Sequence, residues 1–436
     1  MKKTFVFLFS LIQLGCLAQT DTKLLAKLNQ QANEIEPKLI EWRRQFHQYP
    51  ELSNQEFKTG QKIAEYLKSL GMEVQYPVAK TGVVGILQGA KPGPVVALRA
   101  DMDALPISER NSLSFASTQK VIFNGTETGV MHACGHDGHM SILMAVADIL
   151  SRNKSDLKGT VKFLFQPAEE GVANGEEAGA FLMVKEGVLD NPKVDVVFGL
   201  HIQSLLPSGQ LAYRPAGLMA AVDAVNIKIT GVGAHGATPW DSVDPIVISS
   251  EIIMGLQTIV SRQLDLPRAA AVITIGSFHG GIRRNIIPEE VNMEGTIRTF
   301  DLDMQKKVHE KIKLTATKIA EASDAKAEVV IINGYPLTYN DPSLTSQMAP
   351  SLIKVAGAEN VKIIQPVTMA EDFSFFQQKV PGLFYFLGAY PTDMNLTKKP
   401  VHHTADFMLD EKSLVTGVKS LVTLTLDYMN SPRKKN

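Results

Sequence analysis

The stretch Pro94-Val95-Val96-Ala97-Leu98 is a short apolar run rich in branched side chains. Two later runs have the same character, Val161-Lys162-Phe163-Leu164-Phe165 and Val194-Asp195-Val196-Val197-Phe198. Runs of this length and composition are typical of strands buried inside a sheet. An apolar segment from His139 to Leu150 reads as a helix between the first two runs. Strands therefore alternate with helices, and the sequence predicts an α/β sheet domain.

Polar side chains follow each of these three runs. They are Asp101 and Asp103 after the first, Glu169 and Glu170 after the second, and His201 after the third. In open α/β sheets, functional sites gather outside the carboxyl ends of the strands. Three strand ends therefore deliver candidate ligands to one edge of the predicted sheet.

The pattern of elements changes from about residue 216. The expected order is strand 225–229, helix 245–260, strands 271–275 and 291–298, helix 301–322 and strand 328–332. This is the split βαββαβ order, which can fold as a small separate domain. The α/β pattern then resumes after Asn333. We therefore predict a catalytic α/β domain made of residues 19–215 and 334–436, interrupted by a ferredoxin-like α+β lid domain of residues 216–333.

The composition of the chain excludes some classes of protein. Its 436 residues include 44% hydrophobic and 20% charged residues, with a formal net charge of -1. These values describe an ordinary globular protein with no basic excess for binding nucleic acid. After the N-terminus, no apolar stretch reaches the roughly 18 residues that a membrane span requires.

The N-terminus has the layout of a secretory signal peptide. Two lysines precede an apolar run from Phe5 to Leu14, and a stretch of small residues ends at Ala18. We predict cleavage after Ala18, with residues 1–18 removed, and export to the periplasm or the medium. Lipoprotein anchoring through Cys16 is the alternative, but Gln13 stands where that signal normally has an aliphatic side chain. Soluble export is therefore favoured.

Residues 132–139, His-Ala-Cys-Gly-His-Asp-Gly-His, bring together three imidazoles, a thiol and a carboxylate. Thiolate and imidazole are good ligands for zinc-like metals, and carboxylates also suit manganese. The alternative is a polar loop that caps the following helix, with Asp137 as the N-cap. Cys134 is the only cysteine left after the leader, so it cannot form an internal disulfide. The density of ligand types favours a metal site.

Glu169 and Glu170 are adjacent carboxylates, which repel each other unless a cation or a proton compensates. Taken alone, they also fit a solvated charge pair. Beside a metal cluster they gain separate roles, in which one binds metal and the other moves a proton of an activated water.

Three further histidine positions have an ordinary explanation when each is considered alone. His201 suits a core histidine, and His402-His403 suits a surface pair. Both positions become candidates for metal ligands because the cluster at residues 132–139 needs more ligands. His235 lies in the loop 231–239, whose small residues let a substrate or a partner subunit approach closely. A plain turn is the alternative for that loop.

Several longer motifs occur together along nearly all of the mature chain. They are Arg43-Arg44 with His47, Pro50-Glu51-Leu52, residues 98–106 (LRADMDALP), 131–137 (MHACGHD), 166–171 (QPAEEG), the His235 loop, 369–373 (MAEDF) and 403–407 (HTADF). With these motifs, the chain resembles the aminoacylase-type metallopeptidase superfamily. Within it, the chain resembles the bacterial N-acyl-amino-acid amidohydrolases, with the hippurate hydrolases and plant auxin-conjugate hydrolases.

The resemblance implies a zinc-peptidase-like catalytic domain with a mixed sheet and two divalent metal ions per subunit, Mn or Zn. It implies that Glu169 is the general base that later protonates the leaving amine. The implied metal ligands are Cys134, His136, Glu170, His201 and His403.

The resemblance also suggests roles around the substrate. His235 would bind the carbonyl oxygen or the substrate carboxylate, reaching across a homodimer formed by the lid domain. Asn285 and Arg298 are candidates for holding the substrate carboxylate, although Arg298 equally suits a pair with Asp301 or Asp303. Asp101 and Asp103 would orient the ligating imidazoles.

The predicted function is hydrolysis of the amide bond of an N-acyl amino acid or a similar conjugate. A dipeptidase or carboxypeptidase of the same superfamily would use the same ligands and is the first alternative. A non-catalytic metal-binding protein is the second, and the presence of both Glu169 and Glu170 argues against it.

Overall fold

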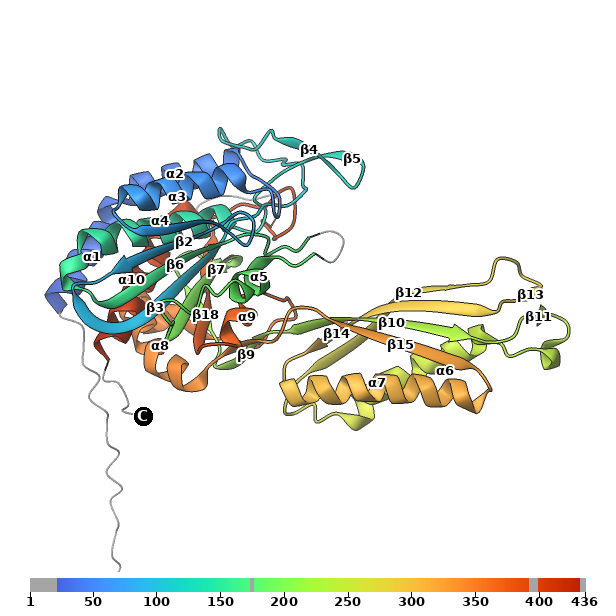
Figure 1. The fold of residues 1–436 in the computed structure, drawn as a ribbon. Helices are drawn as coiled ribbons and strands as arrows, with labels where there is room; N and C mark the ends of the chain where they lie inside the picture. The colour runs from blue at the N-terminus through green and yellow to red at the C-terminus, as the bar shows by residue number, and fades with distance from the viewer. Residues whose placement is uncertain (1–21, 173–175, 392–398, 432–436) are drawn as a thin grey trace, which may run out of the picture.

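The computed structural model describes residues 22–172, 176–391 and 399–431. The predicted signal peptide, with Cys16 and Ala18, lies outside these residues. Figure 1 shows an α/β domain and, beside it, an elongated domain built from the middle of the chain. None of the described helices combines the length and the apolar character needed to cross a membrane.

An eight-stranded mixed sheet forms the centre of the larger domain, in the order β1-β2-β6-β3-β7-β18-β8-β17. The central strands β6, β3, β7 and β18 are parallel, whereas β1, β2 and β8 introduce antiparallel pairs. The strands are β1 (Glu73–Val78), β2 (Gly82–Gln88), β3 (Lys91–Asp101), β6 (Lys158–Gln166), β7 (Val196–Pro207), β8 (Leu211–Tyr213), β17 (Val361–Ile363) and β18 (Gly382–Tyr390). The mixed sheet predicted for the catalytic domain is confirmed.

Helices cover both faces of this sheet. Alternate side chains of β3 enter separate cores, Val96 and Leu98 on one face and Ala97 on the other. Burial on both faces explains why the central strands read as continuous apolar runs. The first face carries α1 (Thr22–Glu34), α2 (Glu36–Gln48), α3 (Phe57–Ser69), α4 (His136–Arg152), α8 (Pro342–Ala356) and α10 (Leu414–Asn430), and the second carries α5 (Gly179–Lys185) and α9 (Ser374–Gln377).

The inserted domain is a four-stranded antiparallel sheet in the order β12-β14-β10-β15, with two helices packed on it. Its elements are β10 (Ala221–Thr230), α6 (Pro245–Thr258) with a π-helical extension (Ile259–Gln263), β12 (Ala271–Gly280), β14 (Glu290–Thr299), α7 (Leu302–Ala322) and β15 (Lys326–Asn333). Chain order and strand order together give the predicted ferredoxin-like arrangement. The domain limits at residues 215/216 and 333/334 stay a prediction.

Short strands complete the two domains and their junction. They are β4 (Lys120–Phe123) with β5 (Thr126–Gly129), β9 (Ala216–Met219) with β16 (Thr338–Asn340), and β11 (Ala234–His235) with β13 (Ile286–Ile287). Single 3-10 turns occur at Lys154–Asp156, Pro239–Asp241, Ala358–Asn360 and Glu411–Ser413. The β9–β16 pair holds together the two chain segments that lead into and out of the inserted domain. Next to it, the amide of Val222 donates to the carbonyl of Tyr335 at 2.9 Å.

Candidate metal centre

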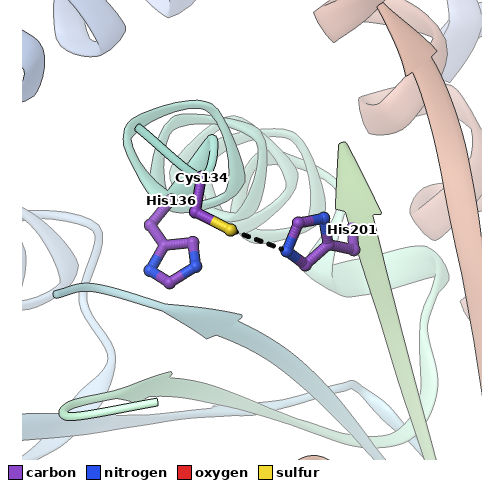
Figure 2. Close-up of side chains that lie close together, drawn as sticks. All are labelled: Cys134, His136 and His201. Carbon is purple, nitrogen blue, oxygen red and sulfur yellow. Dashed lines mark hydrogen bonds between the residues drawn. The ribbon is translucent and has the colours of Figure 1, made fainter. Parts of the chain in front are cut away.

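Five side chains predicted as metal ligands converge at the carboxyl edge of the central strands. The Sγ atom of Cys134 lies 3.5 Å from Nε2 of His201 and 3.3 Å from Nε2 of His403. Oε1 of Glu170 lies 3.2 Å from Nε2 of His403 and 3.8 Å from Nε2 of His136. Figure 2 shows Cys134, two residues before α4, and His136, the first residue of α4, beside His201 on β7, with the cysteine sulfur directed at the His201 ring.

Hydrogen bonds fix which ring nitrogen of two histidines is available to a metal. Nδ1 of His136 lies 2.8 Å from the carbonyl oxygen of Asp103, and Nδ1 of His201 lies 2.7 Å from that of Ile202. A carbonyl only accepts, so each Nδ1 carries the hydrogen and each Nε2 keeps a lone pair. Nε2 of His136 is buried and has no hydrogen-bond partner. Such an orphaned acceptor, held by a bond on the other ring nitrogen, fits a metal ligand.

His139 lies close by but is fully engaged in other bonds. Its Nδ1 lies 2.6 Å from Oδ1 of Asp101, and its Nε2 accepts the backbone N–H of Ile202 at 2.8 Å. No lone pair is left for a metal, so His139 instead ties Asp101 to the strand that carries His201.

The charges at this site call for a cation. Burial raises the pKa of the Cys134 thiol well above its usual value, and the carboxylates of Glu170 and Glu169 raise it further. Burial and the neighbouring ring of His139 lower the pKa of His201, which keeps that imidazole neutral. A divalent cation would stabilise the thiolate and the carboxylates together. The donor set of thiolate, imidazole and carboxylate therefore fits a metal centre.

Glu169 has the environment of a group that exchanges protons. It is 6% exposed, and its Oε2 atom lies 4.0 Å from Nε2 of His136. Burial and the carboxylates of Glu371 and Glu170 raise its pKa well above the ordinary value, and the guanidinium of Arg99 opposes them. A buried carboxyl group with a raised pKa beside candidate metal ligands is a candidate for accepting a proton and returning it.

The backbone around Glu169 is anchored at three successive residues. The N–H of Ala168 donates to Glu56 at 2.8 Å, and the N–H of Glu170 donates to Asp103 at 2.9 Å. The hydroxyl of Tyr335 donates to the carbonyl of Glu169 at 2.6 Å. These anchors stabilise an unusual turn, because Ala168 has a φ of 52°, which is rare for a residue with a side chain.

A buried guanidinium binds three carboxylates near the same edge of the sheet. Arg99, 1% exposed, lies 2.7 Å from Oδ2 of Asp101, 2.9 Å from Oε1 of Glu371 and 3.0 Å from Oδ1 of Asp372. Asp103, by contrast, contacts His136 directly, with Oδ1 3.3 Å from its Nδ1. The two aspartates predicted to orient imidazoles thus contact different rings, Asp101 mainly that of His139.

Arg99 and Glu371 lie in motifs of the sequence, but no role was predicted for them, and Tyr335 and Glu56 were not predicted as site residues. Burial is the property that distinguishes all four, and single residues do not reveal it. Tyr335 had one available signal, because it follows the last strand of the predicted insertion and so marks the domain junction.

Comparison with known proteins shows which family the chain belongs to. The model of peptidase family M20/M25/M40 matches residues 97–427. The chain belongs to this family. It is therefore a metal-dependent hydrolase of amide bonds, as its sequence predicted.

Three curated relatives of this family member illustrate its range. Thermostable carboxypeptidase 1 of Saccharolobus solfataricus is 40% identical over 93% of this chain and 99% of its own length. N-acetyl-L-cysteine deacetylase of Bacillus subtilis is 38% identical over 91% of each chain. An IAA-amino acid hydrolase of Arabidopsis thaliana is 34% identical over 96% of this chain and 92% of its own.

A solved structure has the same fold over almost the whole chain. It is a Bacillus subtilis protein described as a dinuclear metal-binding peptidase of the M20 family. It is 33% identical, covers 92% of this chain with 100% of its own, and superposes with a TM-score of 0.76.

The centre of this family member opens into a cavity of about 720 Å³ between the two domains. Arg298 lies on its wall, where its Nη1 atom donates to the carbonyl of Thr368 at 3.2 Å. Asp301 and Asp303 bind Arg268 instead, at 2.8 and 2.9 Å. Among the described residues Arg298 makes no ion pair, so its guanidinium is available to a carboxylate.

His235 and Asn285 lie elsewhere in the same chain. They line a separate cavity with β11 and β13, and the amide of Gly236 donates to the carbonyl of Asn285 at 2.9 Å. Figure 1 places β11 and β13 at the end of the inserted domain farthest from the α/β domain. A single chain therefore does not bring these two residues to the candidate metal centre.

Proposed function

We propose that this protein hydrolyses the amide bond of N-acyl amino acids or similar conjugates at a centre of two divalent metal ions. The observation that carries the proposal is the buried Glu169, with its raised pKa, beside five converging metal-binding side chains. Two relatives, named as a deacetylase of N-acetyl-L-cysteine and a hydrolase of IAA-amino acids, support this substrate class. The unpaired Arg298 supports a substrate that carries a carboxylate.

The residues divide the work as follows. When bound, two divalent ions would polarise the amide carbonyl and activate a water molecule. Glu169 takes a proton from the attacking water and gives it to the nitrogen of the leaving amine. Arg298 holds the substrate carboxylate. Cys134, His136, Glu170, His201 and His403 would hold the ions.

Substrate profiling of the purified protein, residues 19–436, tests the proposal. It is supplied with manganese or zinc and given acetyl, benzoyl and indoleacetyl amino acids beside free dipeptides, with and without a chelator. Amine release from N-acyl substrates that the chelator abolishes is the expected result. Release from dipeptides alone would favour the carboxypeptidase or dipeptidase reading, to which the 40% identical carboxypeptidase lends weight. No release from any substrate, with metal bound, would leave the non-catalytic reading.

The identity of the metal is tested on the protein itself. Manganese and zinc are the candidates, because the ligand set mixes a thiolate and imidazoles with a carboxylate. Binding to the folded state alone raises stability by about 2.7 kcal/mol when the metal is at a hundred times its Kd. We expect either metal to raise Tm, and His201→Ala to lose most of that rise. His279→Ala, an exposed histidine of the inserted domain, is the control.

We further propose that the protein acts as a homodimer in which His235 of the partner subunit completes each site. The far end of the inserted domain supports this, because it carries His235 and Asn285 together with the exposed apolar side chains Trp240 and Ile282. Ile282 is 97% exposed and Trp240 is 77% exposed.

Mixing two inactive variants tests the shared site. His235→Ala and Glu169→Gln are each expected to be inactive alone. After mixing and reassembly, half of the dimers contain both chains, and one of their two sites is intact, so roughly one quarter of wild-type activity should return. A mixture that stays inactive while forming dimers would overturn the shared site.

Export is proposed from the N-terminal sequence alone. Expression of the full chain in a bacterial host should give a secreted or periplasmic protein whose first residue is Gln19. A mature chain beginning at a lipid-modified Cys16 would instead support the lipoprotein alternative.

A further inference from the structure

Besides Met219, Val222, Met369 and Ala370, the cavity is lined by three apolar side chains from the segment of His201, from its β18 neighbour and from the segment of His403. They are Leu205 on β7, Phe386 on β18 and Val401 in the segment before His403, and we call them the apolar wall. They come from three separate segments of the chain. Leu205 is 47% exposed and Val401 is 41% exposed, although both belong to residue types that usually lie inside.

The geometry of β7 shows how the apolar wall extends relative to the candidate ligand His201. Successive side chains of a strand point to opposite faces, so His201, Gln203 and Leu205 share one face. At about 3.3 Å per residue, Leu205 lies roughly 13 Å along the strand from His201. Phe386 pairs with His201 in the register of β18, with the two ring centroids 6.4 Å apart. The wall therefore begins beside a candidate ligand and leads away from it.

Gln203 lies between His201 and Leu205 in this row, and its side-chain oxygen has a partner within the chain. Oε1 of Gln203 accepts the backbone N–H of Leu205 at 3.3 Å. An apolar group that lies along the strand therefore does not break the hydrogen bond of the Gln203 side-chain oxygen. The same group covers Leu205 and Val401. Removing two such side chains from water is favourable by the hydrophobic effect.

The carboxylate end of the proposed substrate would lie at Arg298, away from the apolar wall. Arg298 pairs with Val222 across β10 and β14, and it donates to Thr368. These residues belong to the junction and the inserted domain, not to the β7–β18 edge. A substrate whose carboxylate lies at Arg298 and whose amide carbonyl lies at the metal centre thus directs its acyl group towards the apolar wall.

We propose that the apolar wall is the acyl-binding site, and that the enzyme prefers medium-length alkanoyl or aromatic acyl groups to acetyl. This inference rests on the proposed function. The methyl of an acetyl group ends one bond from the scissile carbonyl, so it cannot reach Leu205. A longer chain or an aromatic ring covers the wall, and its binding energy orients the amide at Glu169.

A chain-length series measures this preference. N-acetyl, N-butanoyl, N-hexanoyl and N-octanoyl derivatives of one amino acid are compared by kcat/KM, with N-benzoyl as the aromatic member. Because the wall is open to solvent and covers only part of a longer chain, we expect a modest gain per methylene and a rise in kcat/KM of at least about tenfold from acetyl to octanoyl. Free octanoate should inhibit competitively, and acetate should not at the same concentration.

Substitutions in the apolar wall test whether these residues cause the preference for longer acyl groups. Leu205→Asn should cut the octanoyl-to-acetyl ratio of kcat/KM by about tenfold, because only the longer acyl group reaches Leu205. Leu314→Asn, at a half-exposed leucine of α7 outside the cavity, is the matched control and should leave the ratio unchanged. Val401→Asn is a second variant, should Leu205→Asn fail to fold.

Each contrary outcome has a distinct meaning. Chelator-sensitive cleavage of acetyl and octanoyl substrates at equal rates would overturn the inference and leave the proposed function standing. The same holds if Leu205→Asn alters selectivity for the amino-acid side chain and not for the acyl group. If no N-acyl substrate is cleaved, the proposed function itself fails.

Discussion

The hydroxyl of Tyr335 donates to the backbone carbonyl of Glu169 at 2.6 Å. Tyr335 lies two residues after the end of β15, in the segment that returns from the inserted domain. The other two anchors of this backbone, Glu56 and Asp103, belong to the α/β domain. The position of Glu169, the proposed general base, is therefore linked to the domain junction through one side chain.

Loss of this hydroxyl should impair turnover more than binding. In Tyr335→Phe, we expect kcat to fall by about tenfold with KM and metal content nearly unchanged, because a misplaced base costs rate and not ground-state affinity. Steady-state kinetics on one N-acyl substrate, together with metal analysis, checks this. Tyr339→Phe, on the nearby β16 and 42% exposed, is the matched control. An equal loss in both variants would mean that the junction is merely destabilised.

Substitutions of the two adjacent glutamates should differ in how much metal the protein retains. Glu169→Gln is expected to lower kcat by about 10²–10⁴-fold, the usual contribution of a general base, and to keep its metal. Glu170→Gln should lose metal as well as activity, because an amide is a weaker ligand than a carboxylate. Glu177→Gln, an exposed neighbour paired with Lys185, should match the wild type. Metal loss from Glu169→Gln would contradict the assigned roles.

The buried Arg99 should be important for stability. Arg99→Met leaves Asp101, Glu371 and Asp372 without their cation in the sheet interior, and removing one partner of a buried ion pair costs about 3–5 kcal/mol. Urea unfolding with metal present measures the loss. Arg268→Met removes an exposed guanidinium that also contacts two carboxylates, and it should change stability little. Similar effects in both variants would disprove the role of burial.

Lys162 gives a prediction for the pH dependence of stability. Its side chain is buried, its ammonium donates to the carbonyl of Val188 at 2.8 Å, and burial lowers its pKa to about 8 from 10.5. Between pH 8 and 10.5 the unfolded chain binds more protons at this residue than the folded protein does. The contribution of Lys162 to the unfolding free energy therefore rises with pH across that window.

Comparing Lys162→Met with the wild type isolates this contribution. The Tm of the variant relative to the wild type should be highest below pH 8 and should fall steadily towards pH 10.5. Loss of the bond to Val188 adds an offset that does not depend on pH. A difference in Tm that stays constant from pH 7 to 10.5 would show that the lysine keeps its ordinary pKa in the folded protein.

Much of the architecture follows from local sequence pattern. The runs at 94–98, 161–165 and 194–198 lie in β3, β6 and β7, and the predicted βαββαβ insertion has the expected strand order. Other strands escaped notice, such as β17 (Val361–Ile363) and β8 (Leu211–Tyr213). These strands are three residues long, too short to carry a periodic signal, and they form only because a neighbouring strand offers its edge.

The sequence by itself determined the kinds of donor atom and the segments that supply them, since the chemistry of Cys134, His136 and Glu170 belongs to the side chains. The resemblance named His136 and not His139 as a ligand, but the residue types alone gave no reason for the difference, because it depends on whether a bond from Asp103 or Ile202 occupies a given ring nitrogen. Only the tertiary structure decided that, along with the burial that raises the pKa of Glu169 and the distance of His235 from the centre. The physical reason is that burial, hydrogen-bond direction and separation in space arise from segments far apart in the chain.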